Sequence, residues 1–291
     1  MNPKLVAVTL LVSTAIVGMA VLHYRAVDSY QSLGELRVLV GDIHTSMLTL
    51  RRNEKDFLAR KDMRYQQEFI DNYGQLLVYL QAGMQQNELE ASQLNQLAAS
   101  FASYKGQFLA LVELQKEIGF DHQDGLYGSM RGAIHQVEYL LSTQHNDQLS
   151  KDMLMLRRRE KDFMLRNDNA YVEKFDRDML QMHTDLARAY LYPQVKTQIT
   201  AALATYEDHF KALALATEKK GFSSSDGLHG EMRNSVHQAE NILGALRRQS
   251  LQLIGQAGSY MVTQLAAFAI VLVFCMILLV LFLPGRKYGR E

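Results

Sequence analysis

The residues of this sequence best suited to binding chemistry are arginine and glutamate side chains three positions apart on predicted helices. In the segment LRRNEKDF, Arg51 and Glu54 fall within the apolar arc defined by Leu50 and Phe57, because each residue turns a helix by about 100°. A charge that faces a helix-bundle core must be paired or solvated, since an isolated buried charge is destabilising. Two interpretations stay open. The pair belongs to a salt-bridge network that fixes helix register, or the guanidinium group captures an anionic ligand, since it binds a carboxylate through two hydrogen bonds.

A second motif arranges an arginine, a histidine and a glutamate along one stripe of a predicted helix. Arg131, His135 and Glu138 follow an i, i+4, i+7 course beside an apolar stripe. Such a stripe could line a ligand pocket or form hydrogen bonds between helices at the edge of the core. Metal binding is not predicted, because a histidine and a glutamate three residues apart, with no second histidine on the same turn, make a poor ligand set.

Both motifs occur twice, and this repetition is the most informative feature of the sequence. The block LRRNEKDFLARKDMRYQQEF from Leu50 recurs as LRRREKDFMLRNDNAYVEKF from Leu156. The block GFDHQDGLYGSMRGAIHQVE from Gly119 recurs as GFSSSDGLHGEMRNSVHQAE from Gly221. Matches of this length indicate a duplicated unit. The second copies of the candidate residues are Arg157, Glu160, Arg233, His237 and Glu240.

The duplication also predicts how the charged residues are arranged in space. The repeat units span about 40–138 and 146–240. If the two helices that carry the RRxEKDF blocks are neighbours, the arginine and glutamate of both copies meet near a quasi-twofold axis. His122 is replaced by Ser224 in the second copy, so we predict no role for it that both units share.

The composition and the periodicity of the chain predict an all-α fold. Of the 291 residues, 48% are hydrophobic, and the chain has only three prolines and no tryptophan, which suits long helices better than a many-stranded sheet. Apolar residues recur every three or four positions, as expected of helices that bury one face. These stripes include Leu94, Leu97, Phe101, Tyr104, Phe108 and Leu111 in one copy, and Leu203, Tyr206, Phe210 and Leu213 in the other.

Two apolar segments, one near each end of the chain, predict two membrane spans. The segment from Leu265 to Leu283 is uncharged and long enough to cross the roughly 30 Å hydrocarbon core of a bilayer. The segment from Leu5 to Leu22 is also uncharged but shorter, and we interpret it as an uncleaved anchor. Its removal as a signal peptide near Ala20 is the alternative.

A basic tail predicts the orientation of the chain in the membrane. Arg286, Lys287 and Arg290 follow the second apolar segment, so the positive-inside rule places this end in the cytoplasm. The predicted division is a membrane anchor at 1–22, an extracytoplasmic domain at 23–261, a transmembrane helix at 262–284 and a cytoplasmic tail at 285–291.

Seven helices are predicted between the two apolar segments. Two long ones cover about 23–60 and 126–166, and shorter ones about 63–82, 88–117, 169–190, 194–219 and 227–260. Because both ends of this region return to the same membrane, the number of full passes must be even. We therefore expect an in-line break, at Gly83 or Pro193, and two stacked four-helix bundles that share long helices.

Charge, cysteine content and motifs argue against several classes of function. Lysine plus arginine and aspartate plus glutamate both total 31, so no basic excess indicates a nucleic-acid partner. The single cysteine, Cys275, lies in an apolar run and offers neither a disulfide nor a thiolate metal site. The sequence has no phosphate-binding glycine loop, nucleophile elbow or HExxH motif, so we predict no enzyme, no catalytic residue, no metal and no cofactor.

The paired RRxEKDF and DGLxGxMRxxxHxxE blocks resemble the helical bimodular sensor domain of bacterial methyl-accepting chemotaxis receptors and sensor kinases. The resemblance covers roughly residues 30–260. It implies two stacked four-helix bundles in the periplasm, held by two passes through the inner membrane, that bind small organic acids and signal through small displacements of the membrane helices. It also implies that Arg51, Arg131, Arg157 and Arg233 are the candidate carboxylate anchors.

The sequence departs from those receptors after the second apolar segment. Such proteins continue into a linker and a cytoplasmic output domain, whereas this chain ends shortly after Leu283. We therefore expect a chemoreceptor-like transmembrane sensor of carboxylates without a signalling domain of its own, which acts as a homodimer or with a full-length receptor as partner. The alternative is a helical scaffold or partner subunit that binds no metabolite.

Overall fold

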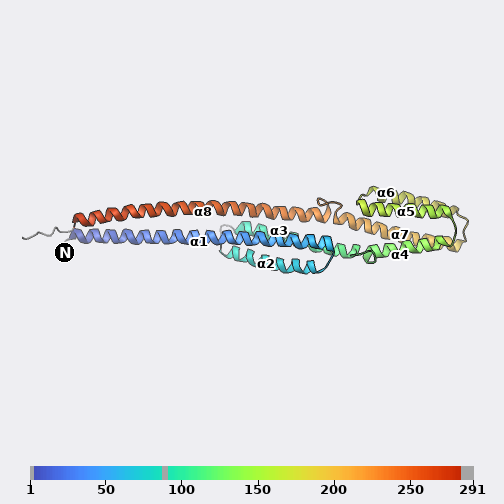
Figure 1. Ribbon diagram of the computed structural model, residues 1–291, viewed down its shortest axis with the longest axis horizontal. Helices are drawn as coiled ribbons and strands as arrows, with labels where there is room; N and C mark the ends of the chain where they lie inside the picture. Colours follow the sequence, from blue (N-terminus) through green and yellow to red (C-terminus); the bar gives the residue numbers. More distant parts are fainter. Residues whose placement is uncertain (1–2, 87–90, 283–291) are drawn as a thin grey trace, which may run out of the picture. The chain divides into compact units, whose positions relative to one another are not determined.

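The computed structural model describes residues 3–86 and 91–282, and within them the chain is all-α (Figure 1). The described elements are eight helices, and no strand occurs among these residues. This confirms the predicted fold class at the level of secondary structure. The helices are α1 (Pro3–Arg60), α2 (Arg64–Gln86), α3 (Ala91–Ile118), α4 (Gly125–Ser142), α5 (Asp147–Arg166), α6 (Ala170–Arg188), α7 (Pro193–Lys220) and α8 (Gly227–Phe282).

The prediction of one continuous helix over 126–166 is wrong, because a turn divides this stretch into α4 and α5. Within that turn His145 has a φ of 46°, a left-handed conformation that a right-handed helix cannot contain. Asn146 then caps α5, since its side-chain oxygen accepts a hydrogen bond from the backbone N–H of Leu149 at 3.0 Å. The polar run STQHND carries this break, but the apolar periodicity on both sides of it conceals the turn.

The places at which the chain continues in line also differ from those expected. Gly83 lies inside α2, and Pro193 begins α7, which packs back against α6. Instead, α3 runs on into α4 through the loop 119–124, and α7 runs on into α8 through the loop 221–226 (Figure 1). The chain also reverses direction between α4 and α5, which was not expected. With this reversal and the two in-line loops, the number of segments that run in alternating directions is even. No break at Gly83 or Pro193 is therefore needed.

Each in-line loop closes through a glycine with a positive φ. The φ of Gly119 is 108° and that of Gly221 is 107°, a conformation that side chains with a Cβ rarely adopt. A Cβ on Gly221 would lie 2.0 Å from the carbonyl oxygen of Asp226, which is too close for any other residue. The repeated GFxxxDG signature therefore specifies a tight loop that joins two helices without reversing the chain.

The described residues divide into two compact units. Unit 1 contains the described parts of 1–47, 76–95 and 241–291, and unit 2 contains 48–75 and 96–240. The two units share α1, α2, α3 and α8, because each of these helices contributes residues to both.

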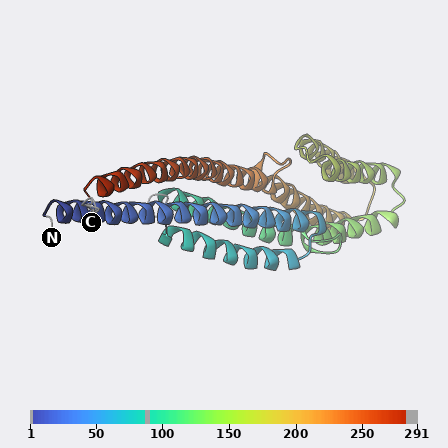
Figure 2. The same cartoon turned by 60° about the vertical axis from the view of Figure 1, so that its left-hand side comes forward.

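In unit 2, helices α4 to α7 form an antiparallel group around one apolar core (Figures 1 and 2). The closest packing is that of α4 against α7 and of α5 against α6. The C-terminal end of α3 contributes to the same core through Leu114 and Ile118. Its fully buried side chains include Ile118, Ile134, Val137, Leu149, Leu156, Phe175, Met182, Ile199, Tyr206 and Phe210.

The aromatic residues of the two sequence copies pack in the same way. The rings of Phe69 and Phe108 are stacked with centroids 4.1 Å apart, and those of Phe175 and Phe210 with centroids 4.0 Å apart. Edge-to-face contacts at 5.4 Å add Tyr104 to the first stack and Tyr206 to the second. The duplication visible in the sequence is therefore a duplication of core geometry.

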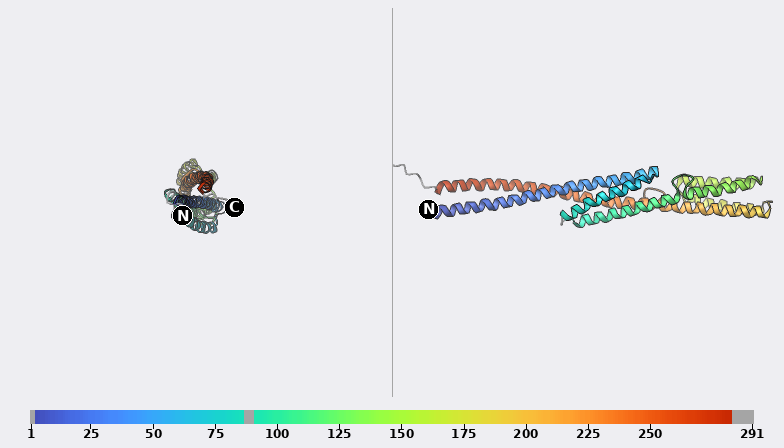
Figure 3. Two further views of the ribbon diagram at one scale, coloured as in Figure 1. Left: turned by 90° about the vertical axis from the view of Figure 1, so that its left-hand side faces the viewer. Right: turned by 90° about the horizontal axis from the view of Figure 1, so that it is seen from below.

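Unit 1 contains the apolar parts of α1 and α8, which lie side by side (Figures 1 and 3). Within the described residues, both helices are long and apolar enough to cross a membrane. Their apolar side chains, such as Val17 on α1 and Ile270 on α8, are mostly exposed. Contiguous apolar surface of this kind is rare on water-soluble proteins, where it marks an interaction surface.

Both apolar helices run past the predicted domain boundaries without a break. Helix α1 continues through residues 22 and 23, and α8 continues through residues 261 and 262. The predicted tail cations Arg286, Lys287 and Arg290 lie outside the described residues, as do residues 283 and 284 of the predicted second span.

A pair of carboxyl groups joins α5 to α6 in unit 2. Gln148 Nε2 donates hydrogen bonds to Asp152 Oδ1 at 2.9 Å and to Asp185 Oδ2 at 3.1 Å. Asp152 is only 7% exposed, and its Oδ2 atom has no hydrogen-bond partner among the described residues. Burial, together with the neighbouring carboxyl of Asp185, raises the pKa of Asp152. Folding therefore favours the protonated form of this side chain.

The free energy of unfolding is expected to contain a component that falls with rising pH. Because the pKa of Asp152 is raised above its usual 3.8, its contribution to stability is complete below that value and is lost as the pH rises through the raised pKa. Asp152→Asn carries a neutral side chain at every pH, so this component should vanish. Urea unfolding of the full chain in detergent micelles, from about pH 4 to about pH 8, measures both proteins. Identical pH profiles would contradict the assignment.

Removal of the stacked aromatic ring of Phe210 from the core is expected to be strongly destabilising. Phe210→Ala leaves a cavity beside Phe175, and a buried phenylalanine replaced by alanine typically lowers the free energy of unfolding by about 3–5 kcal/mol. Leu215→Ala, at a position on α7 that is 53% exposed, is the matched control and should change it by about 0.5 kcal/mol at most. Urea unfolding of both variants checks this, and similar losses for the two would contradict the core assignment.

Candidate anion-binding site

Each RRxEKDF helix is paired with the histidine-bearing helix of the other sequence copy. On α1, Arg51 Nη1 donates to Glu240 Oε1 of α8 at 2.6 Å. On α5, Arg157 Nε lies 3.4 Å from Glu138 Oε1 of α4. The expected meeting of both arginines and both inward glutamates at one quasi-twofold axis is therefore wrong, because each arginine has its own partner helix.

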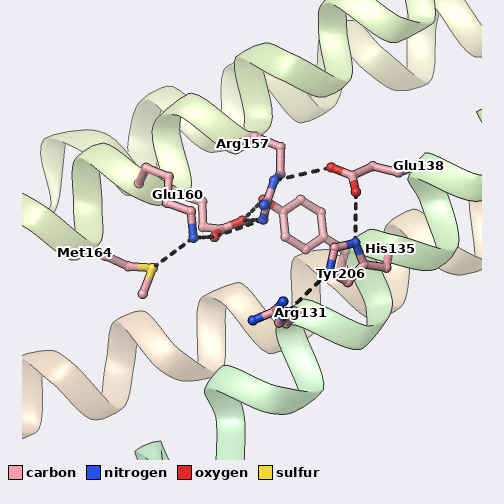
Figure 4. Close-up of polar contacts among 8 residues, drawn as sticks. Arg131, His135, Glu138, Arg157, Glu160, Met164 and Tyr206 are labelled. Carbon is pink, nitrogen blue, oxygen red and sulfur yellow. Dashed lines mark hydrogen bonds and ion pairs between the residues drawn. The ribbon is translucent and has the colours of Figure 1, made fainter. Parts of the chain in front are cut away.

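The predicted site residues thus fall into two clusters within unit 2. The α1/α8 cluster consists of Arg51, Glu54, Arg233, His237 and Glu240, and the α4/α5 cluster consists of Arg131, His135, Glu138, Arg157 and Glu160. Figure 4 shows the α4/α5 cluster, in which side chains from α4, α5 and α7 converge.

The histidine of each cluster connects an arginine to a glutamate on its own helix. In the α4/α5 cluster, Arg131 Nε donates to His135 Nε2 at 3.3 Å, and His135 Nδ1 lies 3.0 Å from Glu138 Oε2 (Figure 4). Because Nε2 accepts, the proton of the neutral ring belongs on Nδ1, where it is donated to the carboxylate. Arg233 and His237 form the same pair on α8 at 3.3 Å. The residues of the predicted stripe therefore form hydrogen bonds mainly with one another along their own helix. Among the residues that the structure describes, only the glutamate of each stripe pairs with an arginine of the neighbouring helix.

A buried glutamate lies at the centre of each cluster. Glu160 is fully buried and Glu54 is 6% exposed. Tyr206 Oη donates to Glu160 Oε2 at 2.8 Å, and Tyr104 Oη donates to Glu54 Oε2 at 2.5 Å. Burial first, and then the neighbouring glutamate, raises the pKa of both tyrosines, so each keeps the proton that it donates.

Lysine side chains complete the coordination of these glutamates, one in each cluster. Lys55 Nζ lies 2.6 Å from Glu54 Oε1, and Lys161 Nζ lies 2.8 Å from Glu160 Oε1. In the α4/α5 cluster, Arg157 also donates to Glu160 at 2.9 Å. The carboxylates buried by folding are thus neutralised within the protein, and they leave little negative charge to repel an incoming anion.

The α1/α8 cluster opens into a cavity of about 540 Å³. Among the described residues that line it, four are arginines or lysines and only Glu54 is acidic. A cavity of this size is within the usual range for small-molecule sites. The positively charged lining residues are Arg51, Lys55, Lys220 and Arg233, and the polar ones include Asn167, Ser223, Ser224, His229 and His237.

Burial and the positive surroundings lower the pKa of two lining residues. Burial and the charge of Lys61 lower the pKa of Lys220. Burial, followed by the charges of Lys220 and Lys55, lowers the pKa of His229. His229 Nε2 is also buried without a hydrogen-bond partner among the described residues. An anion in the cavity would favour the charged forms of both side chains and supply the missing partner of His229.

Arg131 and Arg233 differ from the other two candidate arginines. Neither forms an ion pair with a carboxylate within the described part of the chain, whereas Arg51 and Arg157 do. Arg233 instead donates a hydrogen bond to Ser224 Oγ at 3.3 Å in the loop 221–226. Its guanidinium therefore has donors left for a ligand.

The α4/α5 cluster lines a smaller cavity of about 260 Å³. In this copy Tyr127 stands where His229 stands in the other, and Ile118 stands in place of Lys220. The two clusters therefore share their glutamates, arginines and histidines but differ in size and charge. The residues that line the smaller cavity are His122, Tyr127, Met130, Arg131, His135, Arg157, Glu160, Lys161 and Met164.

Sequence reasoning missed several residues of these clusters. Tyr104 and Tyr206 were assigned only to the apolar core, although a tyrosine at the same place in two otherwise apolar stripes signals a hydrogen bond. Lys220 and His229 have no counterpart in the first copy, so the repeat could not single them out.

Comparison with protein-family models finds no match, and no curated protein or solved structure is significantly similar to this chain. The assignment of a function therefore depends on the geometry of these clusters.

Removal of one tyrosine hydroxyl is expected to destabilise the protein. Tyr206→Phe leaves the buried Glu160 with one donor fewer, and hydrogen bonds to charged groups are typically worth about 1.5–3 kcal/mol. Tyr190→Phe, at a fully exposed position, is the matched control and should have no effect. Urea unfolding of the full chain compares the two. An unchanged free energy of unfolding for Tyr206→Phe would show that the bond to Glu160 is dispensable.

Proposed function

We propose that this chain is a two-pass membrane sensor that captures a small organic acid in the cavity of the α1/α8 cluster. The observation that carries the proposal is the charge of that cavity, which four cationic side chains and a single glutamate line. The glutamate is already bound by Lys55 and Tyr104. A ligand with one or more carboxylates balances the remaining positive charge, and a guanidinium binds a carboxylate through two hydrogen bonds.

Membrane insertion is the second part of the proposal. The apolar parts of α1 and α8 have the length and composition of membrane spans, and their side chains are exposed to whatever surrounds them. Lipid is the environment in which such a surface is stable. With both helices inserted, residues 23–261 lie on one side of the membrane, which the resemblance described above identifies as the periplasm of a bacterial cell. The same resemblance supports an arrangement of two stacked four-helix bundles.

The ion pair between Arg51 and Glu240 suggests how binding is transmitted. It connects α1 to α8, the two helices that continue into the apolar segments. Because Arg51 also lines the cavity, a bound carboxylate competes with Glu240 for the guanidinium. A ligand shifts a conformational equilibrium only through a difference in its affinity for two states. Exchange of one carboxylate for another at Arg51 supplies such a difference.

The same ion pairs favour a second candidate function, that of a helical scaffold or a partner subunit of a full-length receptor. Arg51 and Arg157 are both engaged by protein carboxylates, as expected if their role is to fix helix register. In this case neither cavity binds a metabolite. A homodimer or a complex with a full-length chemoreceptor is compatible with either function.

The two functions are separated by titration of the full chain in lipid nanodiscs with succinate, malate, citrate and acetate. The sensor predicts that at least one acid binds and that Arg233→Gln weakens binding about 10- to 100-fold, the loss of one charge-assisted bidentate contact. The matched control is Arg131→Gln at the equivalent position of the α4/α5 cluster, which should leave the affinity of the α1/α8 cavity unchanged. Isothermal titration calorimetry measures both variants.

Absence of binding to a folded, correctly inserted protein would instead support the scaffold. Circular dichroism of each variant shows whether it remains helical, so that a loss of binding is not confused with a loss of fold. Equal weakening by Arg131→Gln and Arg233→Gln would contradict the choice of the larger cavity.

A further inference from the structure

A further cavity, of about 510 Å³, lies between α1 and α8 in unit 1. It is separate from both charged clusters, and apolar side chains form most of its lining. Its size falls within the range of small-molecule sites. The lining residues are Met19, Ala20, Leu22, His23, Tyr260, Gln264, Leu265, Ala267 and Phe268.

The cavity straddles the end of the apolar run on both helices. His23 is the first polar residue after the apolar segment that ends at Leu22, and Gln264 is the last polar residue before the segment that begins at Leu265. Tyr260 lies one turn further from the apolar segment of α8, in the position that amphipathic aromatic residues favour at a membrane surface. A molecule in this cavity would therefore have one end in the lipid and the other at the lipid–water boundary.

Two polar atoms of the cavity residues lack partners. His23 Nδ1 and Gln264 Oε1 are both buried without a hydrogen-bond partner among the described residues. Gln264 Oε1 can only accept a hydrogen bond, whereas His23 Nδ1 donates or accepts according to its tautomer. A hydroxyl group suits both kinds of atom, because it donates to an amide oxygen and accepts from an imidazole N–H.

We propose that this cavity binds a lipid-soluble phenol, a class that includes hydroquinones, with its hydroxyl between His23 and Gln264 and its apolar body between the two helices. The rings of Tyr260 and Phe268 favour an aromatic body, since aromatic pairs gain from edge and offset contacts. An acyl chain or a phosphodiester group has no hydrogen to donate to Gln264 Oε1. The inference rests on the membrane insertion proposed above, but it does not depend on the carboxylate site.

Photolabelling of the full chain in lipid nanodiscs tests this proposal with a matched pair of probes. One probe is 4-octylphenol with a diazirine on its alkyl chain, and the other is its methyl ether, 4-octylanisole, which has the same shape but no hydroxyl donor. Mass spectrometry of the labelled peptides locates the products. The phenol is expected to label the segments 19–23 and 260–268 about three- to tenfold more than the ether, the value of one hydrogen bond.

Variants of the chain confirm the role of the polar atoms. Gln264→Leu removes the acceptor and should abolish the difference between the two probes. Gln252→Leu, the same change at an exposed position of α8 that does not line the cavity, should retain it. Equal labelling by phenol and ether, or uniform labelling along the apolar length of α8, would overturn the proposal and indicate a gap filled by ordinary lipid.

The failure of this inference is distinguishable from failure of the proposed function. Alkaline extraction of membranes reports insertion separately, and titration with carboxylates reports the α1/α8 cavity separately. Loss of the difference between phenol and ether in Gln264→Leu, with unchanged carboxylate affinity, assigns the effect to the cavity that His23 and Gln264 line. Specific phenol labelling without any carboxylate binding would leave this site standing and contradict only the proposed organic-acid function.

Discussion

The structure depends on two carboxylates that folding removes from water. Glu54 and Glu160 are both buried, and an unpaired charge in such a place would unfold a protein of ordinary stability. Each is therefore surrounded by donors: a tyrosine hydroxyl from the core stripe of a neighbouring helix, and a lysine from its own helix. These contacts oblige the EKDF helix to pack with its glutamate inward, and they fix which helix supplies the tyrosine. The orientation of the adjacent arginines, and with it the position of both cavities, follows from that constraint.

The duplication explains why the two clusters are alike and also why they differ. Each cluster combines the RRxEKDF block of one copy with the histidine-bearing block of the other, so neither copy completes a cluster alone. The tyrosine and the lysine that hold the buried glutamate are the same in both. Lining positions have diverged: His229 lines the larger cavity where Tyr127 lines the smaller one, and Lys220 adds a cation to the larger cavity where the other copy has the core residue Ile118. When lining residues diverge while the residues that support them stay the same, one scaffold acquires distinct ligand preferences.

The sequence predicts the helices and the candidate residues far better than their partners. Helical periodicity locates most helices, and the repeat locates the arginines, histidines and inward glutamates. It does not reveal the turn at His145, because a single left-handed residue between two apolar stripes leaves the periodicity intact on either side. It also does not reveal that Arg51 pairs with Glu240, since contacts between the copies depend on tertiary packing that a repeat alone cannot specify. The sequence does not single out Lys220 and His229 for a related reason, because their lowered pKa values depend on the charges and the burial around them.

The helices α1 and α8 carry the elements of both proposals. Each is a continuous helix, and each contributes a charged residue to the ion pair of the α1/α8 cluster and a polar residue to the cavity that His23 and Gln264 line. Under both proposals, a ligand would act on contacts between the same two helices: at one cavity it would compete with Glu240 for Arg51, and at the other it would fill a space that His23 and Gln264 border. Because coupling between two ligands is a reciprocal free energy, any preference of the two sites for different arrangements of α1 and α8 makes binding at one alter affinity at the other. A chain built in this way would combine information on a water-soluble anion with information on the composition of the membrane.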